Sequence, residues 1–347
     1  MGHIWRRGSQ WFDHAHGLTL DGRHWLLVRC PIAGQVQLFL LSAAVCTPRR
    51  RFHTSPDGSG TIERFRSNVY APRNQVFSLN RRSDIRFALL GLYALFFVGT
   101  VSTLAEGAKP NFVVIFIDDM GYGDIGPFGS KVNSTPHLDQ MCDEGMKLTS
   151  FYAAPVCSAS RAQLLTGSYA PRVSVPGVFF PAGRLGLNPD EETVAEYLRG
   201  LGYATTCIGK WHLGDQPDFL PTRHGFDHYF GIPYSNDMQR VAQANGKRVL
   251  PLMRDEEVAD LLEDEGQRRV TREYTQEAVK YIAEHQDEPF FLYLPHTAMH
   301  IPLFPHENFR GKSRNGVYGD WVQEVDWSVG QVLAALKEND LQKNTFV

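Results

Sequence analysis

The sequence lacks an excess of charge of either sign. Its 347 residues include 35 Lys and Arg against 38 Asp and Glu, which gives a formal net charge of −3 at pH 7. No basic excess indicates a nucleic acid or an anionic membrane as a partner, and no acidic run is typical of a disordered tail. Repeats and low-complexity tracts are absent as well. We therefore expect a globular chain with room for one large domain or two ordinary ones.

Cysteines are too few for a disulfide scaffold, and a domain of this size does not require one. Cys30 and Cys46 precede the regularly patterned part of the chain, which holds Cys142, Cys157 and Cys207. Three cysteines in an exported protein leave at least one thiol without an internal partner.

The sequence also lacks a hydrophobic run long enough to cross a bilayer as a helix, which requires roughly 20 residues. The apolar run at 87–101 follows Arg81, Arg82 and Arg86 and precedes small residues at 102–105. This order predicts a secretory signal peptide near residues 81–105, with a membrane anchor as the alternative.

The predicted signal divides the chain into three parts. Residues 81–108 are expected to be the signal peptide and a linker, so the protein would be exported to the periplasm, a lysosome or the extracellular space. Because a signal normally begins a protein, we expect residues 1–80 to be a doubtful or disordered N-terminal extension. Residues 109–347 are expected to fold.

From residue 109 onward, strand and helix patterns alternate. Strands are predicted at 111–117, 146–152, 203–208 and 290–294. Helices are predicted at 136–144, 158–166, 190–201, 269–285 and 319–339. The alternation predicts an α/β domain in which helices flank a largely parallel sheet, with its chemistry at the carboxyl ends of the strands.

Two adjacent carboxylates, Asp118 and Asp119, follow the first predicted strand. Such neighbours repel each other unless a cation lies between them, and oxygen ligands suit Ca²⁺ or, less well, Mg²⁺. A solvated turn is the alternative, since Asp and Gly are common in turns.

Cys157 is predicted at the beginning of a helix, where free N–H groups and the helix dipole favour an anion. Arg161 lies four residues on and shares its helix face. A nucleophile beside a guanidinium suits attack on a sulfate or phosphate ester. A buried structural cysteine is the alternative.

Lys210 and His212 follow the strand predicted at 203–208. If the extended backbone continues, their side chains lie on the same side, where a cation could hold an anionic group and an imidazole could move its proton. A surface lysine and a packed histidine are the alternative.

Two histidines, His296 and His300, follow the strand predicted at 290–294. Their spacing on a helix would suggest zinc, but flanking prolines and the lack of a Glu between them argue against a helical zinc motif. We expect His300 to lie in a loop at the sheet edge, where it could protonate a leaving alcohol.

These segments together resemble the sulfatase family, in particular its arylsulfatase A and N-acetylgalactosamine-6-sulfatase branch. The segment 157–167 resembles the family signature Cys-x-Pro/Ala-x-Arg followed by Thr-Gly, with Ala159 at the variable position. Gly-Lys-Trp-His at 209–212 is similarly typical, and the stretch ending in Ser235 resembles one that lines the sulfate pocket. The resemblance implies an alkaline phosphatase-like layered fold, with residues 109–347 as the N-terminal catalytic domain.

The resemblance also implies roles for single residues. Cys157 would be converted to formylglycine by a formylglycine-generating or equivalent maturation enzyme, and its hydrate would attack a sulfate ester. The Ca²⁺ ligands would include Asp118, Asp119 and the modified Cys157. Lys210, His300 and Ser235 would contact the substrate, a sulfated small molecule or polysaccharide. Arg161 would hold the hydrate, His212 would assist release, and His300 would protonate the leaving oxygen.

One departure from the family pattern concerns the end of the chain at Val347. The family completes its metal site with an Asp-Asn pair on the strand after the last predicted helix. A second, substrate-binding lysine and a smaller C-terminal domain follow further along. We therefore expect a C-terminally truncated chain with little or no activity alone. The alternatives are a phosphodiester or phosphonate ester hydrolase of the same superfamily, and an inactive sulfatase relic that binds carbohydrate.

Overall fold

The computed structural model describes residues 15–20, 23–29, 36–39, 109–243 and 245–347. By its internal contacts the chain divides into two units, residues 1–104 and 105–347. The first unit holds an antiparallel sheet in the order β1-β2-β3, formed by Ala15–Leu20, Arg23–Arg29 and Val36–Phe39.

The N-terminal predictions remain predictions. The β1-β2-β3 sheet lies within residues 1–80, and the predicted signal peptide at 81–105 lies outside the described residues. In the described part of the chain, no helix is both long and apolar enough to cross a bilayer.

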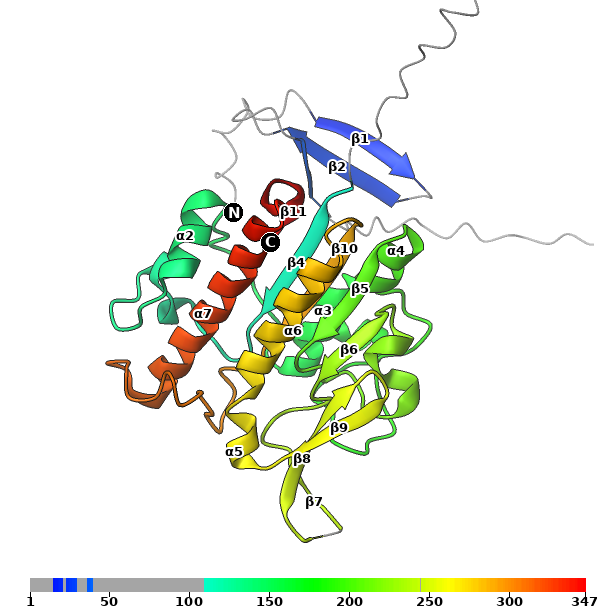
Figure 1. Cartoon of the computed structure of the whole chain (residues 1–347). Coiled ribbons are helices and arrows are strands. Elements are labelled where there is room, and N and C mark those ends of the chain that lie inside the picture. The colour runs from blue at the N-terminus through cyan, green and yellow to red at the C-terminus, as the bar shows by residue number, and fades with distance from the viewer. Residues whose placement is uncertain (1–14, 21–22, 30–35, 40–108, 244) are drawn as a thin grey trace, which may run out of the picture. The chain divides into compact units, whose positions relative to one another are not determined.

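The second unit is built on a mixed eight-stranded sheet in the order β11-β4-β10-β5-β6-β8-β7, with β9 paired to β8 (Figure 1). The strands from β11 to β6 run parallel, whereas β7, β8 and β9 join by antiparallel pairing. Their bounds are β4 Asn111–Phe116, β5 Ala204–Ile208, β6 His228–Gly231, β7 Arg240–Val241, β8 Arg248–Arg254, β9 Glu257–Leu262, β10 Phe290–Pro295 and β11 Thr345–Phe346.

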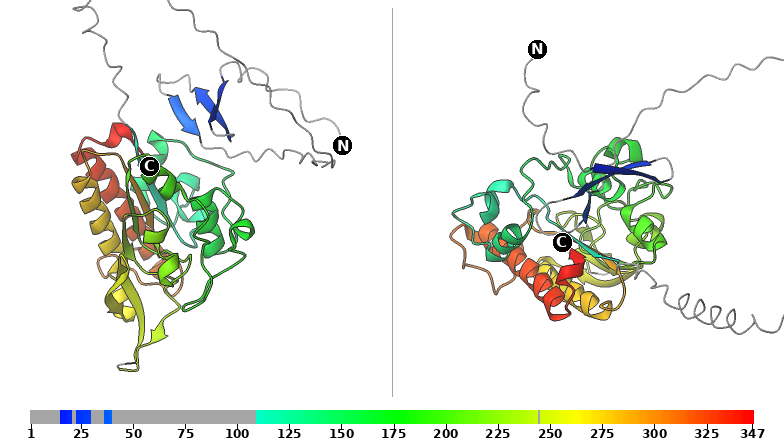
Figure 2. Two further views of the ribbon diagram at one scale, coloured as in Figure 1. Left: turned by 90° about the vertical axis from the view of Figure 1, so that its right-hand side faces the viewer. Right: turned by 90° about the horizontal axis from the view of Figure 1, so that it is seen from above.

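Helices cover both faces of this sheet, as the left view of Figure 2 shows. Their bounds are α2 Pro136–Glu144, α3 Cys157–Thr166, α4 Val194–Gly200, α5 Asp264–Gln267, α6 Val270–Glu284 and α7 Gly316–Glu338. One apolar core joins the sheet to α6 and α7, and a second joins it to α3 and α4. β10 lies between them with all six residues buried, as expected of a strand inside a parallel sheet.

The predicted α/β class and the mixed, largely parallel sheet are confirmed. The helix predicted at 190–201 is shorter than expected, because Thr193 caps it. The Thr193 side chain accepts a hydrogen bond from the Glu196 backbone N–H at 3.2 Å. In turn, the Glu196 carboxylate accepts one from the Thr193 backbone N–H at 2.8 Å. This capping box fixes the beginning of α4 at Val194.

The strand predicted at 146–152 is wrong. This segment is irregular and pairs with no strand among the described residues. Its apolar side chains point to solvent, with Met146 63% and Tyr152 82% exposed. Strand-forming side chains alone do not make a strand, because the backbone N–H and C=O groups of a strand need a partner.

Candidate active site

Asp118 lies at the carboxyl end of β4 and is buried. Its Oδ2 is in contact with the Lys210 Nζ and lies 3.3 Å from Nη2 of Arg161. Burial raises the pKa of this carboxyl, but the charges of Arg161 and Lys210 outweigh burial and hold the pKa below its usual value. Asp118 is therefore ionised and anchors two cations.

Arg161 lies on α3, one turn after Cys157, with its side chain fully buried. Its Nη1 donates a hydrogen bond to the Lys210 carbonyl at 2.5 Å, and the guanidinium lies 5.2 Å from the centre of the Phe116 ring. The Nε of Arg161 has no hydrogen-bond partner among the described residues. Such an unused buried donor could bind an oxygen atom from outside the chain.

Cys157 is the first residue of α3 and is partly buried as a free thiol. Because α3 begins at this residue, the helix presents unpaired N–H groups around it. Arg161 follows Cys157 by four residues on α3, so the two side chains share one face of this helix.

Lys210 follows β5 and is fully buried. Besides its contact with Asp118, its Nζ donates a hydrogen bond to Ser235 Oγ at 3.0 Å. Burial, and then the positive charge of Arg161, lower its pKa. Close packing before Lys210 requires glycine: a Cβ on Gly209, at φ +138°, would lie 2.0 Å from the Pro295 carbonyl oxygen.

His212 is buried beside Lys210, but its backbone leaves the extended conformation at φ 58°. Its Nε2 lies 2.9 Å from the Phe179 carbonyl oxygen, so Nε2 carries the proton. Nδ1 is then a buried acceptor that has no partner in the part of the chain that the structure describes. Burial, with the nearby charge of Lys210, lowers the pKa of His212 to about 3. The ring is neutral and can accept a proton only weakly.

His300 lies in the loop after β10. The backbone N–H of Asp118 donates to the Ala298 carbonyl at 2.8 Å, which holds this loop beside the end of β4. The Nδ1 of His300 lies 2.6 Å from the Ile301 carbonyl oxygen, and its Nε2 lies 3.9 Å from Oδ2 of Asp119. With Nδ1–H committed to a carbonyl, Nε2 is the atom free to exchange a proton.

His296 lies apart from these groups. Its Nε2 lies 3.1 Å from Oγ of Ser328 on α7, and burial lowers its pKa to about 4. It is a neutral residue of the core, and this agrees with the expectation that His296 and His300 do not form a helical zinc motif.

Two residues that the sequence did not single out lie beside Ser235. Asn236 is buried, and its Nδ2 donates to the carbonyls of His300 at 3.3 Å and Pro302 at 3.0 Å. The Oδ1 of Asp237 lies 3.9 Å from Nδ1 of His300. The sequence offered one sign of their role, their position directly after Ser235. Their contacts could not be foreseen, because the partner residues lie more than 60 positions further along the chain.

Comparison with known proteins decides the family. A family model described as "Sulfatase" matches residues 110–347. The chain belongs to the sulfatase family. It is 40% identical to N-acetylgalactosamine-6-sulfatase of Sus scrofa over 258 residues, covering 69% of this chain and 49% of that protein. Arylsulfatase A of Bos taurus is 37% identical over 264 residues, covering 70% and 52%.

Solved structures agree with the alkaline phosphatase-like fold expected of a sulfatase. PsFucS1 sulfatase from Pseudoalteromonas sp. superposes with a TM-score of 0.63 at 28% identity, covering 77% of this chain and 58% of that one. The protein Ps i-CgsB gives a TM-score of 0.61 at 30% identity, covering 68% and 57%. This sulfatase chain spans about half the length of the curated relatives it matches.

The predicted ligands for a metal ion in this sulfatase chain are two adjacent carboxylates, those of Asp118 and Asp119. Asp119 has an exposed side chain, and Asp118 gives one of its oxygens to Lys210 and Arg161. Among the described residues, no group of three or more His, Cys, Asp and Glu could hold a metal ion. The two carboxylates suit a hard cation, but Ca²⁺ takes 6–8 oxygens, so they supply only part of its shell.

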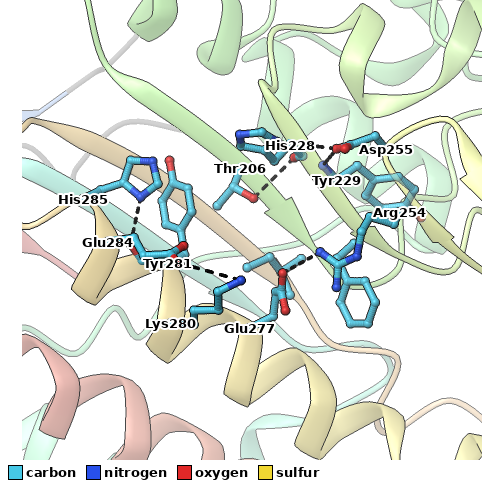
Figure 3. A pocket seen from close by; sticks show the side chains of 12 residues that line it. Thr206, His228, Tyr229, Arg254, Asp255, Glu277, Lys280, Tyr281, Glu284 and His285 are labelled. Atoms are coloured by element: carbon cyan, nitrogen blue, oxygen red, sulfur yellow. Dashed lines mark hydrogen bonds and ion pairs between the residues drawn. The ribbon is translucent and has the colours of Figure 1, made fainter. Parts of the chain in front are cut away.

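A cavity of about 190 Å³ lies between β5, β6, β8 and α6 (Figure 3). Charged residues at its rim form pairs with one another: Arg254 with Glu277 at 2.6 Å, His228 with Asp255 at 3.7 Å, and Lys280 with Glu284 at 3.8 Å. None of the predicted site residues lines it.

Proposed function

We propose that this chain provides the catalytic centre of a sulfuric ester hydrolase that cleaves sulfate esters of carbohydrates. One observation carries the proposal: two fully buried cations, Arg161 and Lys210, share a single buried carboxylate, that of Asp118. The neighbouring His212 is neutral. A buried surplus of positive charge is unfavourable unless an anion compensates it, and a sulfate monoester brings one negative charge.

Cys157 supplies the nucleophile in this proposal. A maturation enzyme oxidises it to formylglycine, and the hydrate of that aldehyde provides the hydroxyl that attacks sulfur. Arg161, on the next turn of α3, orients the hydrate through its unused Nε donor. The beginning of α3 directs backbone N–H groups at the developing negative charge.

Lys210 and Ser235 hold the sulfate group. Since the Nζ of Lys210 donates to Ser235 Oγ, the hydroxyl hydrogen of Ser235 is free to donate to a sulfate oxygen. His300 protonates the leaving alcohol oxygen through Nε2, while the neutral His212 assists release of sulfate by accepting a hydrogen bond at Nδ1.

Asp118 and Asp119 would hold Ca²⁺, or Mg²⁺ less well, together with the modified Cys157 and further oxygen ligands. A bound divalent cation would polarise the sulfate oxygens and the nucleophile. Because the described residues supply only part of the shell, we expect the chain alone to release little sulfate.

Relatives and neighbours support a sulfated carbohydrate as the substrate. One group of relatives is named N-acetylgalactosamine-6-sulfatase, and Ps i-CgsB, 31% identical, was solved in complex with k-i-k-neocarrahexaose. A steryl-sulfatase of Mus musculus is 36% identical, so the family extends beyond sugars. Export through the signal peptide predicted near residues 81–105 completes the proposal.

Peptide mass spectrometry of the full chain, co-expressed with a formylglycine-generating enzyme, tests the nucleophile. We expect the aldehyde at Cys157 and unmodified thiols at Cys142 and Cys207, which serve as internal controls. An unmodified thiol at Cys157 would contradict the proposal and favour a carbohydrate-binding relic.

A further inference from the structure

A groove of about 590 Å³ opens beside His300. Asp237 and Pro302, which flank His300, form one end of it. The beginning of β8 and the region around α5 form the rest, and these elements lie together near β7 in Figure 1. The volume is within the range of roughly 300–1,000 Å³ found for sites that bind small molecules.

Hydrogen bonds tie the groove to His300. Asn236 donates to the carbonyls of both His300 and Pro302, so the histidine and the wall of the groove are held by one buried amide. The carboxylate of Asp237 lines the groove and lies 3.9 Å from the His300 ring. A molecule whose leaving oxygen lies at His300 would extend into this groove.

The lining is polar and carries more negative than positive charge. Four carboxylates face two cations, Lys247 and Arg248. Lys247 pairs with Glu263 at 2.6 Å, and Gln239 donates to Asp264 at 2.9 Å. Carboxylates accept hydrogen bonds from hydroxyl groups and repel further anions. The lining thus favours uncharged, hydroxyl-rich molecules over sulfated ones.

Apolar surface at the rim suits a sugar ring as well. Ile301 is 69% exposed and, with Pro302, presents carbon atoms next to His300. A sugar has an apolar C–H face and a polar rim of hydroxyls, and sugar sites combine hydrogen bonds with such apolar contact.

We infer that this groove is the subsite for the leaving-alcohol side of the substrate, and that it takes an uncharged saccharide rather than a second sulfated unit. The inference rests on the proposed function, because the role of His300 places the leaving oxygen beside the groove.

Saccharide binding to the full chain tests the inference without turnover. The probes are β-1,4-galactotetraose and the same tetraose after chemical sulfation, titrated by calorimetry. Gln239→Trp fills the groove, and Gln140→Trp places the same side chain on the exposed surface of α2 as a control. We expect the wild type and Gln140→Trp to bind the uncharged tetraose equally, and Gln239→Trp to bind it at least about tenfold more weakly.

A second variant tests the charge argument. Asp264→Lys reverses one lining charge and should strengthen binding of the sulfated tetraose relative to the uncharged one. Equal binding of the uncharged tetraose by the wild type and Gln239→Trp would overturn the inference, as would tighter wild-type binding of the sulfated probe. If the chain keeps its Cys157 thiol after co-expression with the formylglycine-generating enzyme but binds the tetraose, the proposed function alone is contradicted. If the aldehyde forms but the tetraose does not bind, the subsite alone is contradicted.

Discussion

The Nζ of Lys210 lies 3.0 Å from Oγ of Ser235, although the two residues follow different strands, β5 and β6. This contact forms because β5 and β6 are parallel neighbours, so the segments after them leave the sheet at the same edge. The same Nζ contacts Asp118, which follows β4. Three segments of the chain thereby meet at one buried ammonium group.

Asp118→Asn is expected to lower the free energy of unfolding by roughly 3–5 kcal/mol, because it leaves Arg161 and Lys210 buried without a carboxylate. Urea denaturation in the presence of a chelator measures this. Asp287→Asn, at an exposed position, is the control and should stay within about 0.5 kcal/mol of the wild type.

Gly209→Ala is expected to destabilise the domain by more than about 4 kcal/mol, since the new Cβ would clash with the Pro295 carbonyl oxygen at a positive φ. Gly200→Ala, in α4 with no atom near its Cβ position, should be neutral or slightly stabilising. Thermal and urea denaturation of the two variants compare them, and equal stability would contradict this account of the packing.

Glu324→Gln is expected to flatten the pH dependence of stability. Burial raises the pKa of Glu324 to about 8 from the usual 4.5, so the native state holds a proton that the unfolded state releases between these values. This contribution to stability is present below pH 4.5 and is lost as the pH rises towards 8. The loss, of roughly 2–4 kcal/mol, should be missing in Glu324→Gln and unchanged in Glu338→Gln, an exposed position on the same helix.

Asn236→Ala removes the amide that holds the carbonyls of His300 and Pro302. We expect a loss of about 1–3 kcal/mol in unfolding free energy, because two partly buried hydrogen bonds that hold this loop are lost. Hydrogen exchange around residues 298–302 should also become faster. Asn308→Ala, at an exposed position in the following loop, should change neither quantity.

Much of the parallel part of the fold could be predicted, because β4 and β10 are nearly continuous apolar runs and α6 and α7 each bury one apolar face. The antiparallel part could not. In β9 five of six residues are exposed, so it shows no apolar pattern, and its identity as a strand comes from pairing with β8. Pairing also explains the error at 146–152, where strand-forming residues have no partner among the described residues.

The expectation that chemistry lies at the carboxyl ends of parallel strands led to Asp118, Lys210 and His300. The structure places all three at this edge of the sheet. Their catalytic roles stay predictions. Asn236 and Asp237 could not be found from the sequence, since a single Asn or Asp carries no pattern and its function here depends on a loop far along the chain.

Titration of the full chain with inorganic sulfate tests most directly whether Arg161 and Lys210 form a pocket for the sulfate group. The account predicts one sulfate bound per chain, with affinity at least about tenfold lower in Lys210→Met and unchanged in Lys280→Met, whose side chain is exposed. Absence of binding by the wild type, or equal affinity in a folded Lys210→Met variant, would contradict it.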